Sequence, residues 1–218
     1  MLPKPYWQDM TTLDFQSQGV EDWIAVLPVA AIEQHGPHLP LSTDTTIAEG
    51  QVKRVLELLP TGLPVTFLPV QAVGKSDEHI SSPGTLTLAW DTVTRAWLEL
   101  GESVARAGIR KLVLINSHGG NVPVLDIVAR ELRVKHDMFV TATNWLRFGQ
   151  PDGLYADAEF TYGIHGGDIE TSLMLHLRPD LVRMELATIF RRNSKLTCRN
   201  SSICVATAKP NTAGRRRT

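Results

Sequence analysis

The segment EQHGPHLPLSTD concentrates side chains that bind divalent metal ions. It contains Glu33, His35 and Asp44, and a carboxylate beside an imidazole suits a divalent transition metal. If the chain here continues a strand, Glu33 and His35 are two positions apart and project from the same side into one pocket. The prolines between His35 and Asp44 can bend the chain back, so that the two oxygens of Asp44 could bridge two ions. We predict that this segment forms half of a metal site.

Further candidates lie in two later segments. In INSHGGN, His118 would leave the end of a buried strand, and the two glycines after it would let the backbone approach a ligand closely. GIHGGDIETS offers His165, Asp168 and Glu170 at the start of the last helix, where exposed backbone N–H groups also favour negative charge. These segments are expected to converge with the first one at one edge of a sheet.

Single residues of these types carry weak information. A lone histidine near a strand end is more often a hydrogen-bonded structural residue than a ligand, an interpretation that applies to His38, His79, His136 and His176. Other acids are most simply solvated or helix-capping groups: Glu49, Asp77, Glu78 and Asp91. The candidates in EQHGPHLPLSTD and INSHGGN differ, because they fall at predicted carboxyl ends of strands or just beyond, where open α/β sheets bind ligands.

The elements that must position these residues follow a regular alternation. Strand-like apolar runs alternate with amphipathic segments of helical length, which is the pattern of parallel βαβ units and predicts an α/β fold. Strands are expected at residues 23–32, 64–70, 84–88, 111–116 and 138–145. Helices are expected from residue 43 or 44 to Pro60, and at 91–107, 121–136 and 167–177. The polar, glycine-bounded segment 149–163 is expected to be a loop over a site.

Length and composition favour one domain that acts on small molecules. The 218-residue chain is 43% hydrophobic and 21% charged, which allows a sizeable single core. Its formal net charge of -1 gives no electrostatic attraction to nucleic acid or anionic lipid. The longest apolar run, residues 23–32, is far shorter than the ~20 residues that span a bilayer, and MLPKPYWQDM lacks a charged segment followed by an apolar one. We expect a cytoplasmic protein with no nucleic-acid or membrane partner.

The composition changes near the C-terminus. From Arg191 onward the chain has no sustained hydrophobic period and collects Asn, Ser, Thr and Arg, so residues 191–218 are predicted to be a poorly ordered tail. The domain itself is predicted to cover residues 1–190. The only cysteines, Cys198 and Cys204, lie in the tail and form no disulfide framework or metal-type cluster.

Several segments together resemble the signature segments of the creatininase (creatinine amidohydrolase) family. They are EQHGPHLPLSTD, GKSDEH, SPGTLTL, NSHGGN and HGGDIETS, in the order and spacing of the family, from near the N-terminus to about residue 190. The resemblance implies a three-layer α/β/α fold with a mainly parallel sheet. It also implies a dinuclear centre of zinc, manganese or iron, hydrolysis of an amide or cyclic amide, and a homo-oligomer, commonly a hexamer.

The resemblance further implies two metal subsites that share one carboxylate. Carried over by position, Glu33, Asp44 and His118 hold one ion. His35 and Asp44 hold the other, and Asp44 is the bridge. Two divalent ions per chain are therefore expected.

Other family positions concern the substrate. Ser76 matches a substrate-contacting serine, and His165 matches the catalytic histidine of the last motif. Creatinine-hydrolysing members carry a Tyr-Glu pair after the third-motif histidine, and that glutamate binds the second metal, whereas this chain carries Gly119 and Gly120. Creatinine is therefore not the expected substrate, and Glu170 is the candidate replacement ligand. Members with the Gly-Gly form resemble formamide deformylases and peptide-processing enzymes.

The preferred hypothesis is two-metal hydrolysis of a small-molecule amide: the ions acidify a water and polarise the scissile carbonyl, and His165 protonates the departing nitrogen. Backbone N–H groups around Gly119 and Gly120, or Ser76, would stabilise the oxyanion. The alternative is a non-catalytic or truncated member that serves as an assembly or metal-binding subunit, because the tail does not resemble the family's glycine-rich, aromatic C-terminal segment. A serine hydrolase is a weaker alternative, since neither Ser76 nor Ser117 lies in a G-x-S-x-G context.

Overall fold

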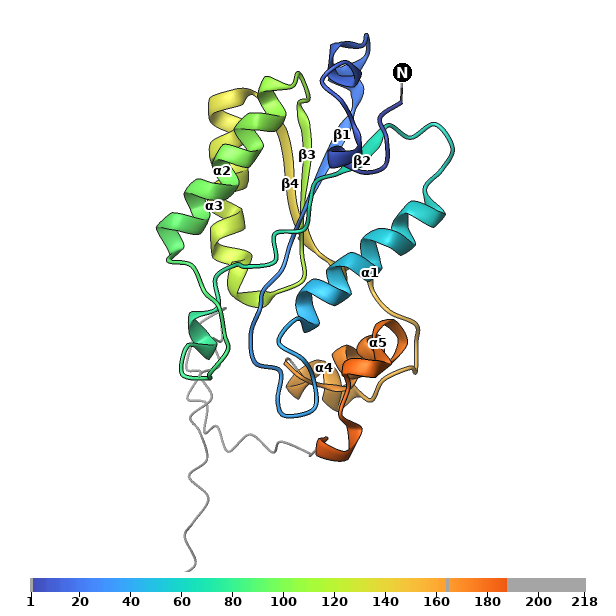
Figure 1. Cartoon of the computed structure of the whole chain (residues 1–218), viewed down its shortest axis with the longest axis vertical. Coiled ribbons are helices and arrows are strands. Elements are labelled where there is room, and N and C mark those ends of the chain that lie inside the picture. Colours follow the sequence, from blue (N-terminus) through green and yellow to red (C-terminus); the bar gives the residue numbers. More distant parts are fainter. Residues whose placement is uncertain (1, 164, 188–218) are drawn as a thin grey trace, which may run out of the picture.

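The computed structural model describes residues 2–163 and 165–187, which are built around one parallel sheet (Figure 1). Its strands are β1 (Ile24–Val29), β2 (Val65–Phe67), β3 (Lys111–Asn116) and β4 (Phe139–Asn144). The order across the sheet is β2-β1-β3-β4, and all neighbours are parallel. Parallel neighbours require crossover connections, which place the carboxyl ends of all strands at the same edge. The predicted α/β fold is confirmed.

Helices cover both faces of the sheet. They are α1 (Thr43–Leu58), α2 (Trp90–Arg106), α3 (Val122–His136), α4 (Asp157–Tyr162) and α5 (Asp168–Leu177). α2 and α3 lie side by side on one face, and α1 lies on the other (Figure 1). α5 packs against α1 near the carboxyl ends of the strands. The result is the three-layer α/β/α arrangement that the family resemblance implied.

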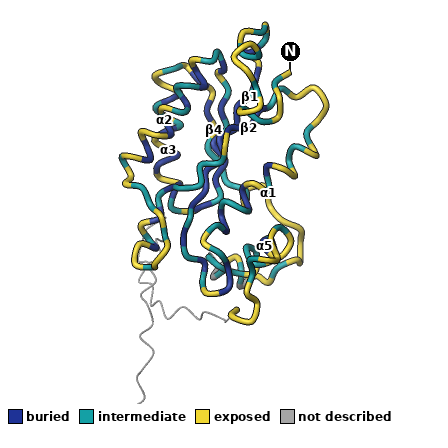
Figure 2. The backbone as a smooth tube through the Cα atoms, in the orientation of Figure 1, coloured by how far each residue is buried: buried dark blue, intermediate teal, exposed yellow. Residues whose placement is uncertain are grey.

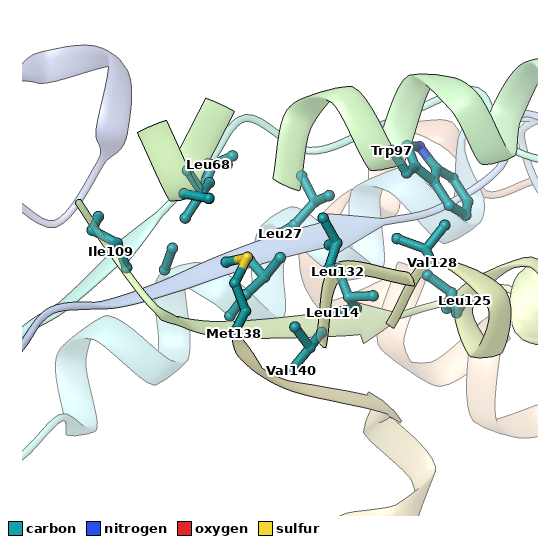
Figure 3. Packing of buried hydrophobic residues seen from close by; sticks show 14 of the residues in the cluster. Leu27, Leu68, Trp97, Ile109, Leu114, Leu125, Val128, Leu132, Met138 and Val140 are labelled. Atoms are coloured by element: carbon teal, nitrogen blue, oxygen red, sulfur yellow. The ribbon is translucent and has the colours of Figure 1, made fainter. Parts of the chain in front are cut away.

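The core explains why the central strands read as continuous apolar runs. In β1, Leu27 and Val29 join the core beneath α2 and α3, whereas Val26 joins the core beneath α1. Trp97 of α2 and Val128 of α3 fill the first of these cores (Figure 3). Because both faces of the sheet are covered, every position of the strand must be apolar. The two central strands, β1 and β3, are accordingly buried along most of their length, whereas the edge strand β4 is largely exposed or half-buried (Figure 2).

The loop after β1 folds back on itself. The backbone N–H of Glu33 donates to the carbonyl of Leu41 at 3.0 Å, and His35 and Leu39 form an antiparallel bridge. Gly36 makes the turn between them at φ 80°, a left-handed conformation that glycine adopts readily. The chain therefore returns to the strand end that it left and begins α1 there, as the prolines of this loop predicted.

Local expectations were wrong at three places. Residues 84–88 form no strand, and only Leu86 pairs, in a single antiparallel bridge with Ile32. β2 is shorter than the run expected at residues 64–70. The segment 149–163, expected to be a loop, contains α4, whose six residues are too few to show a hydrophobic period.

Residues 188–218 lie outside the described residues, and with them the predicted tail, Cys198 and Cys204. The division of the chain at residue 190 stays a prediction. Within the described part of the chain, no helix combines the length and the apolar character needed to cross a membrane.

Candidate metal centre

Acidic and imidazole side chains meet at the carboxyl ends of β1 and β3. Glu33 and His35 follow β1, Asp44 lies in the first turn of α1, and His118 follows β3. Glu170 comes from the first turn of α5. All of these residues except Glu170 are buried. Because parallel strands end at one edge of the sheet, the fold brings together segments that are far apart in the sequence.

Asp44 faces two histidines at once. Its Oδ1 lies 3.2 Å from His35 Nε2, and its Oδ2 lies 3.4 Å from His118 Nδ1. The residue is 2% exposed, and an ionised carboxylate is costly to bury unless positive charge lies beside it. One oxygen points toward each of two neighbouring subsites, which is the arrangement expected of a bridging carboxylate.

The first subsite lies between Glu33, Asp44 and His118. Glu33 Oε1 is 3.0 Å from His118 Nδ1. Glu33 Oε1 and Asp44 Oδ2 are buried and have no hydrogen-bond partner among the described residues. Buried polar atoms that converge without hydrogen-bonding one another suit a cation between them. Ser76 donates a hydrogen bond to the other oxygen, Glu33 Oε2, and so orients this carboxylate.

The second subsite is expected between His35, Asp44 and Glu170. Around His35, the side chains close enough to hold an ion together are Glu33 and Asp44 in one group, and His165 and Glu170 in another. Glu170 Oε1 is 3.7 Å from His35 Nε2. His35 Nδ1 donates a hydrogen bond to the backbone carbonyl of Glu33 at 3.0 Å, because a carbonyl oxygen can only accept. Nε2 of the neutral ring therefore carries the lone pair that a metal needs, and this atom too is buried with no hydrogen-bond partner among the described residues.

His165 reaches the cluster from the segment before α5. Its Nε2 donates a hydrogen bond to the backbone carbonyl of Gln34, which leaves Nδ1 facing Glu33 Oε1 at 3.6 Å. The centre of its ring lies 4.2 Å from that of His35 and 4.2 Å from that of His79, on which it stacks. Burial, and then the charge of His35, lower the pKa of His165 to about 4. The ring is thus neutral near pH 7, and Nδ1 can accept a proton.

Contacts from a loop and from α4 position the segment that carries His165. A Cβ on Gly166 would lie 3.1 Å from the backbone oxygen of His35, so a glycine allows the two loops to approach. Glu159 of α4 accepts a hydrogen bond from the backbone N–H of Ile169 at 3.1 Å and caps the start of α5. The helix that the sequence did not predict therefore contributes to the geometry of the site.

The carboxylates control the charge of the two buried histidines. Burial lowers the pKa of His35, but contacts with Asp44 and Glu170 more than offset this effect, and its pKa lies well above the ordinary value. The pKa of His118 is likewise raised, because contacts with Asp44 and Glu33 outweigh burial. Burial opposes ionisation of Asp44, yet the two histidines hold its pKa well below the usual range. His35 and His118 thus hold a proton more readily than ordinary imidazoles do, whereas His165 does not.

Two residues of the cluster were not predicted. Glu78 and His79, by sequence a solvated acid and a structural histidine, both reach the cluster from the 3-10 turn Asp77–His79. Glu78 Oε1 lies 3.2 Å from His118 Nε2, and His79 Nε2 lies 3.9 Å from Glu33 Oε1. Four imidazole rings therefore come within 4.0 Å of that one oxygen. Both residues belong to the motif GKSDEH, of which only the serine, Ser76, was predicted to lie at the site.

The two glycines after the third-motif histidine have different surroundings. Among the described residues, nothing lies within 4 Å of a Cβ built on Gly119, so the backbone there is open to a ligand, as expected. A Cβ on Gly120 would collide with the backbone oxygen of Lys75. Ser76 is fully buried, and its hydroxyl is bonded to a carboxylate of the cluster. Direct contact of Ser76 or Gly120 with a substrate stays a prediction.

Other polar residues lie outside the cluster. His38 Nε2 lies 3.0 Å from the Thr171 hydroxyl, while its buried Nδ1 has no hydrogen-bond partner among the described residues. His136 lies 3.4 Å from Glu102. The structural interpretation of both histidines stays a prediction. Asp168 is exposed at the start of α5 and contributes no atom to the groups of side chains that could hold a metal.

Comparisons with known proteins found a family profile, related sequences and solved structures that resemble this chain. The family profile described as "Creatininase: Creatinine amidohydrolase" matches residues 8–211. The mycofactocin precursor peptide peptidase of Mycolicibacterium smegmatis is 36% identical over 159 residues, which cover 72% of this chain and 59% of that protein. The creatinine amidohydrolase of Pseudomonas putida is 35% identical over 179 residues, which cover 75% of this chain and 68% of that protein. The chain thus spans less than two thirds of the length of the peptidases that it matches.

Solved structures of creatininase share the fold. A mutant with phenylalanine in place of tryptophan gives a TM-score of 0.73 at 28% identity, over 94% of this chain and 85% of that chain. A glutamate-to-glutamine mutant of the Zn-Zn type gives 0.68 at 30% identity, and a manganese creatininase gives 0.66 at 27% identity, both over 85% of this chain and 77% of that chain. Since the profile covers most of the sequence and the relatives share more than a third of the aligned residues, the chain belongs to the creatininase family.

Proposed function

We propose that the protein is a metal-dependent amidohydrolase that cleaves a carbon–nitrogen bond with two divalent ions per chain. The position of Asp44 carries this proposal, because its two oxygens face His35 and His118 separately. Glu33 completes the first subsite and Glu170 the second. Zinc, manganese or iron suit such a mixture of imidazole and carboxylate ligands, and creatininases of zinc and manganese type share the fold.

His165 is the proposed proton carrier. When bound, the ions supply a water of lowered pKa and polarise a carbonyl group. His165 faces the cluster through Nδ1, while the carbonyl of Gln34 fixes its Nε2. Because its ring starts neutral, Nδ1 first accepts a proton from the attacking water and then gives it to the departing nitrogen. The residue expected from the sequence to be a general acid thus acts as a base first.

The backbone at Gly119 and Gly120 is the proposed stabiliser of the oxyanion that forms on the substrate carbonyl. Open space beside Gly119 supports this role. The hydroxyl of Ser76 orients the Glu33 carboxylate and contributes to the reaction through that contact.

An amide other than creatinine is the proposed substrate class: a formamide, a cyclic amide or a peptide-like amide. Gly119 and Gly120 replace the Tyr-Glu pair of creatinine-hydrolysing members, so a substrate ring loses an aromatic wall on which to pack. A small formamide or an extended peptide-like amide loses less. The names of the relatives, a peptide peptidase and a creatinine amidohydrolase, both describe cleavage of carbon–nitrogen bonds.

The second candidate function, left open by the sequence, is a metal-binding or assembly subunit without activity of its own. For both candidate functions we propose that the chain forms a homo-oligomer. The family resemblance implies a hexamer. Amide hydrolysis by the purified, metal-saturated chain excludes the second candidate.

Metal analysis followed by a substrate screen tests the proposal. After chelation and reloading with Zn²⁺, Mn²⁺ or Fe²⁺, the chain should bind two ions, and Asp44→Ala should bind neither, since both subsites lose a ligand. Asp91→Ala is the matched control, because it removes an aspartate from the first turn of α2 that pairs with Arg95 at the surface. An active preparation with one ion per chain contradicts the dinuclear centre.

The screen compares kcat/KM for formamides, lactams, short peptides and creatinine. Creatinine should be the poorest of them, because errors of ~1 Å in aligning the reacting groups cost on the order of 10²-fold in rate. Efficient creatinine hydrolysis would show that Gly119 and Gly120 do not exclude this substrate.

A further inference from the structure

We propose that Glu78 is a positioning residue that orients His118 for metal binding, so that a carboxylate, an imidazole and an ion form one line of contacts through the first subsite. The inference rests on the proposed metal centre and adds to it a residue outside the ligand set. Glu78 Oε1 lies 3.2 Å from His118 Nε2, on the side of the ring that does not face the subsite.

The two nitrogens of His118 have different partners. Nδ1 faces Glu33 Oε1 at 3.0 Å and Asp44 Oδ2 at 3.4 Å. Nε2 lies 2.9 Å from the backbone oxygen of Lys75 and 3.2 Å from Glu78 Oε1. When an ion takes the place of the proton that Nδ1 shares with Glu33 and Asp44, Nδ1 offers its lone pair, and Nε2 keeps its hydrogen because both of its partners are acceptors. Rotation of the ring or a change of tautomer would break these contacts.

The backbone carbonyl of Lys75 offers His118 Nε2 a neutral acceptor, and the Glu78 carboxylate adds a negative charge beside it. A carboxylate that accepts the second N–H of a ligand histidine increases the basicity of the ring and fixes its orientation. The side chain of Glu78 is 16% exposed, so water screens its charge only partly. Glu78 therefore strengthens Nδ1 of His118 as a metal ligand.

The space that Glu78 occupies exists because residue 120 has no side chain. A Cβ on Gly120 would collide with Glu78 Oε1, with the backbone oxygen of Lys75 and with Nε2 of His118 itself. The backbone oxygen cannot move without displacing the turn that carries Glu78. A side chain at residue 120 is therefore incompatible with the observed contact between Glu78 and His118, and Gly120 and Glu78 form a matched pair.

Metal affinity measured with a competing chromophoric chelator tests the proposal. Glu78→Gln keeps the size of the side chain and removes its charge. It should weaken the affinity for the ion that His118 binds by about 10–100-fold. The second ion should keep its affinity. Asp77→Asn is the matched control, because Asp77 is the preceding acid of the same turn and pairs with Lys75 at 2.6 Å. Unchanged affinity in Glu78→Gln overturns the inference and leaves the proposed function intact.

The number of ions and the spectrum of Co²⁺ separate positioning from direct ligation. At saturation, Glu78→Gln should still bind two Co²⁺ ions, with altered ligand-field bands and an unchanged melting temperature of the chelated protein. Loss of one ion at saturation would make Glu78 a ligand and overturn the positioning role. If the wild-type chain binds no metal, the inference falls together with the proposed function.

Alanine variants of Gly119 and Gly120 test whether Gly120 and Glu78 depend on each other, with metal affinity as the only measurement. Gly120→Ala should weaken binding of the same ion as Glu78→Gln, because the added methyl group meets Glu78, the turn that carries it and His118 Nε2. The double variant should lose at least as much affinity as Gly120→Ala alone, but less than the sum of the two single losses, since both variants disturb the Glu78 contact. Gly119→Ala, with open space beside it, should keep wild-type metal affinity. Equal effects of the two alanine variants would contradict the pairing of Gly120 with Glu78.

Discussion

Asp44 shows how one side chain can hold two subsites together. Its carboxylate is nearly fully buried, and burial of an ionised group requires positive partners. His35 and His118 provide them on separate oxygens. Contact with these rings keeps the pKa of Asp44 well below its usual range even though burial opposes ionisation. In the proposed centre, the same oxygens would bind the ions that replace the protons of the rings.

Metal binding should release protons. Contacts with carboxylates outweigh burial and raise the pKa of both His35 and His118, so each ring of the chelated protein keeps its proton to a higher pH than an ordinary imidazole does. A ligand nitrogen must give up that proton, and metal affinity should therefore rise with pH until both raised pKa values are passed. Calorimetric titration with Zn²⁺, in buffers of different ionisation enthalpy, should show protons released on binding. Absence of proton release would contradict the raised pKa values.

Replacing His165 should separate proton transfer from metal binding. His165→Gln removes the basic Nδ1 that faces the cluster, so kcat should fall by about 10²–10⁴-fold while both ions stay bound. Metal content and kcat are measured on the same preparation. His136→Gln is the control, since His136 pairs with Glu102 outside the cluster. Loss of an ion in the His165 variant would identify this residue as a ligand instead.

At the scale of elements, packing between helices depends on a glycine. A side chain on Gly101 of α2 would collide with Leu132 of α3, which is fully buried and cannot swing away. Gly101→Ala should therefore destabilise the fold by about 1–3 kcal/mol through overpacking, against the gain of about 0.5–1 kcal/mol usual for this change in a helix. Urea unfolding measures the difference.

Leu132→Ala supplies the control for this prediction. It makes room for the new methyl group, so the double variant should be less destabilised than the sum of the single variants. Strict additivity would show that the two helices do not press on each other at Gly101.

Elements long enough to show a regular repeat of apolar residues could be predicted from the sequence, and shorter elements could not. β3 has the expected bounds, and α2 is displaced by one residue. α4 is a six-residue helix, too short to show a period. Residues 84–88 alternate like a strand, but a strand also needs a partner along its length, and that is a property of the whole fold.

The residues of the site also differ in how far the sequence alone could indicate them. Glu33, His35 and Asp44 could be proposed because residue type and position after a strand are both visible in the sequence. Glu78 could not, because its direction depends on a short turn and on the space left by Gly120. Orientation within a turn is set by the packing around it, and no spacing rule reports it.

At the scale of the whole molecule, the ions should stabilise the fold. The centre joins the loop after β1, the segment after β3 and the start of α5. An ion that binds only the folded chain adds about 2.7 kcal/mol at a free concentration of 100 Kd. Chelation should therefore lower Tm by roughly 5–10 °C for each ion removed. Asp44→Ala should not respond to chelator, and equal melting of the wild type with and without chelator would contradict a metal-linked fold.

The four imidazole rings around Glu33 Oε1 have a consequence for cation selectivity. Mg²⁺ and Ca²⁺ favour oxygen ligands, and Mg²⁺ in particular keeps several waters when it binds. A buried cluster that offers nitrogen atoms has little room for a hydration shell. Millimolar Mg²⁺ or Ca²⁺ should consequently fail to restore the Tm of the chelated protein, whereas micromolar Zn²⁺ should restore it. Ligand chemistry alone would then keep the alkaline-earth ions out of this cluster, however strongly its carboxylates attract divalent charge.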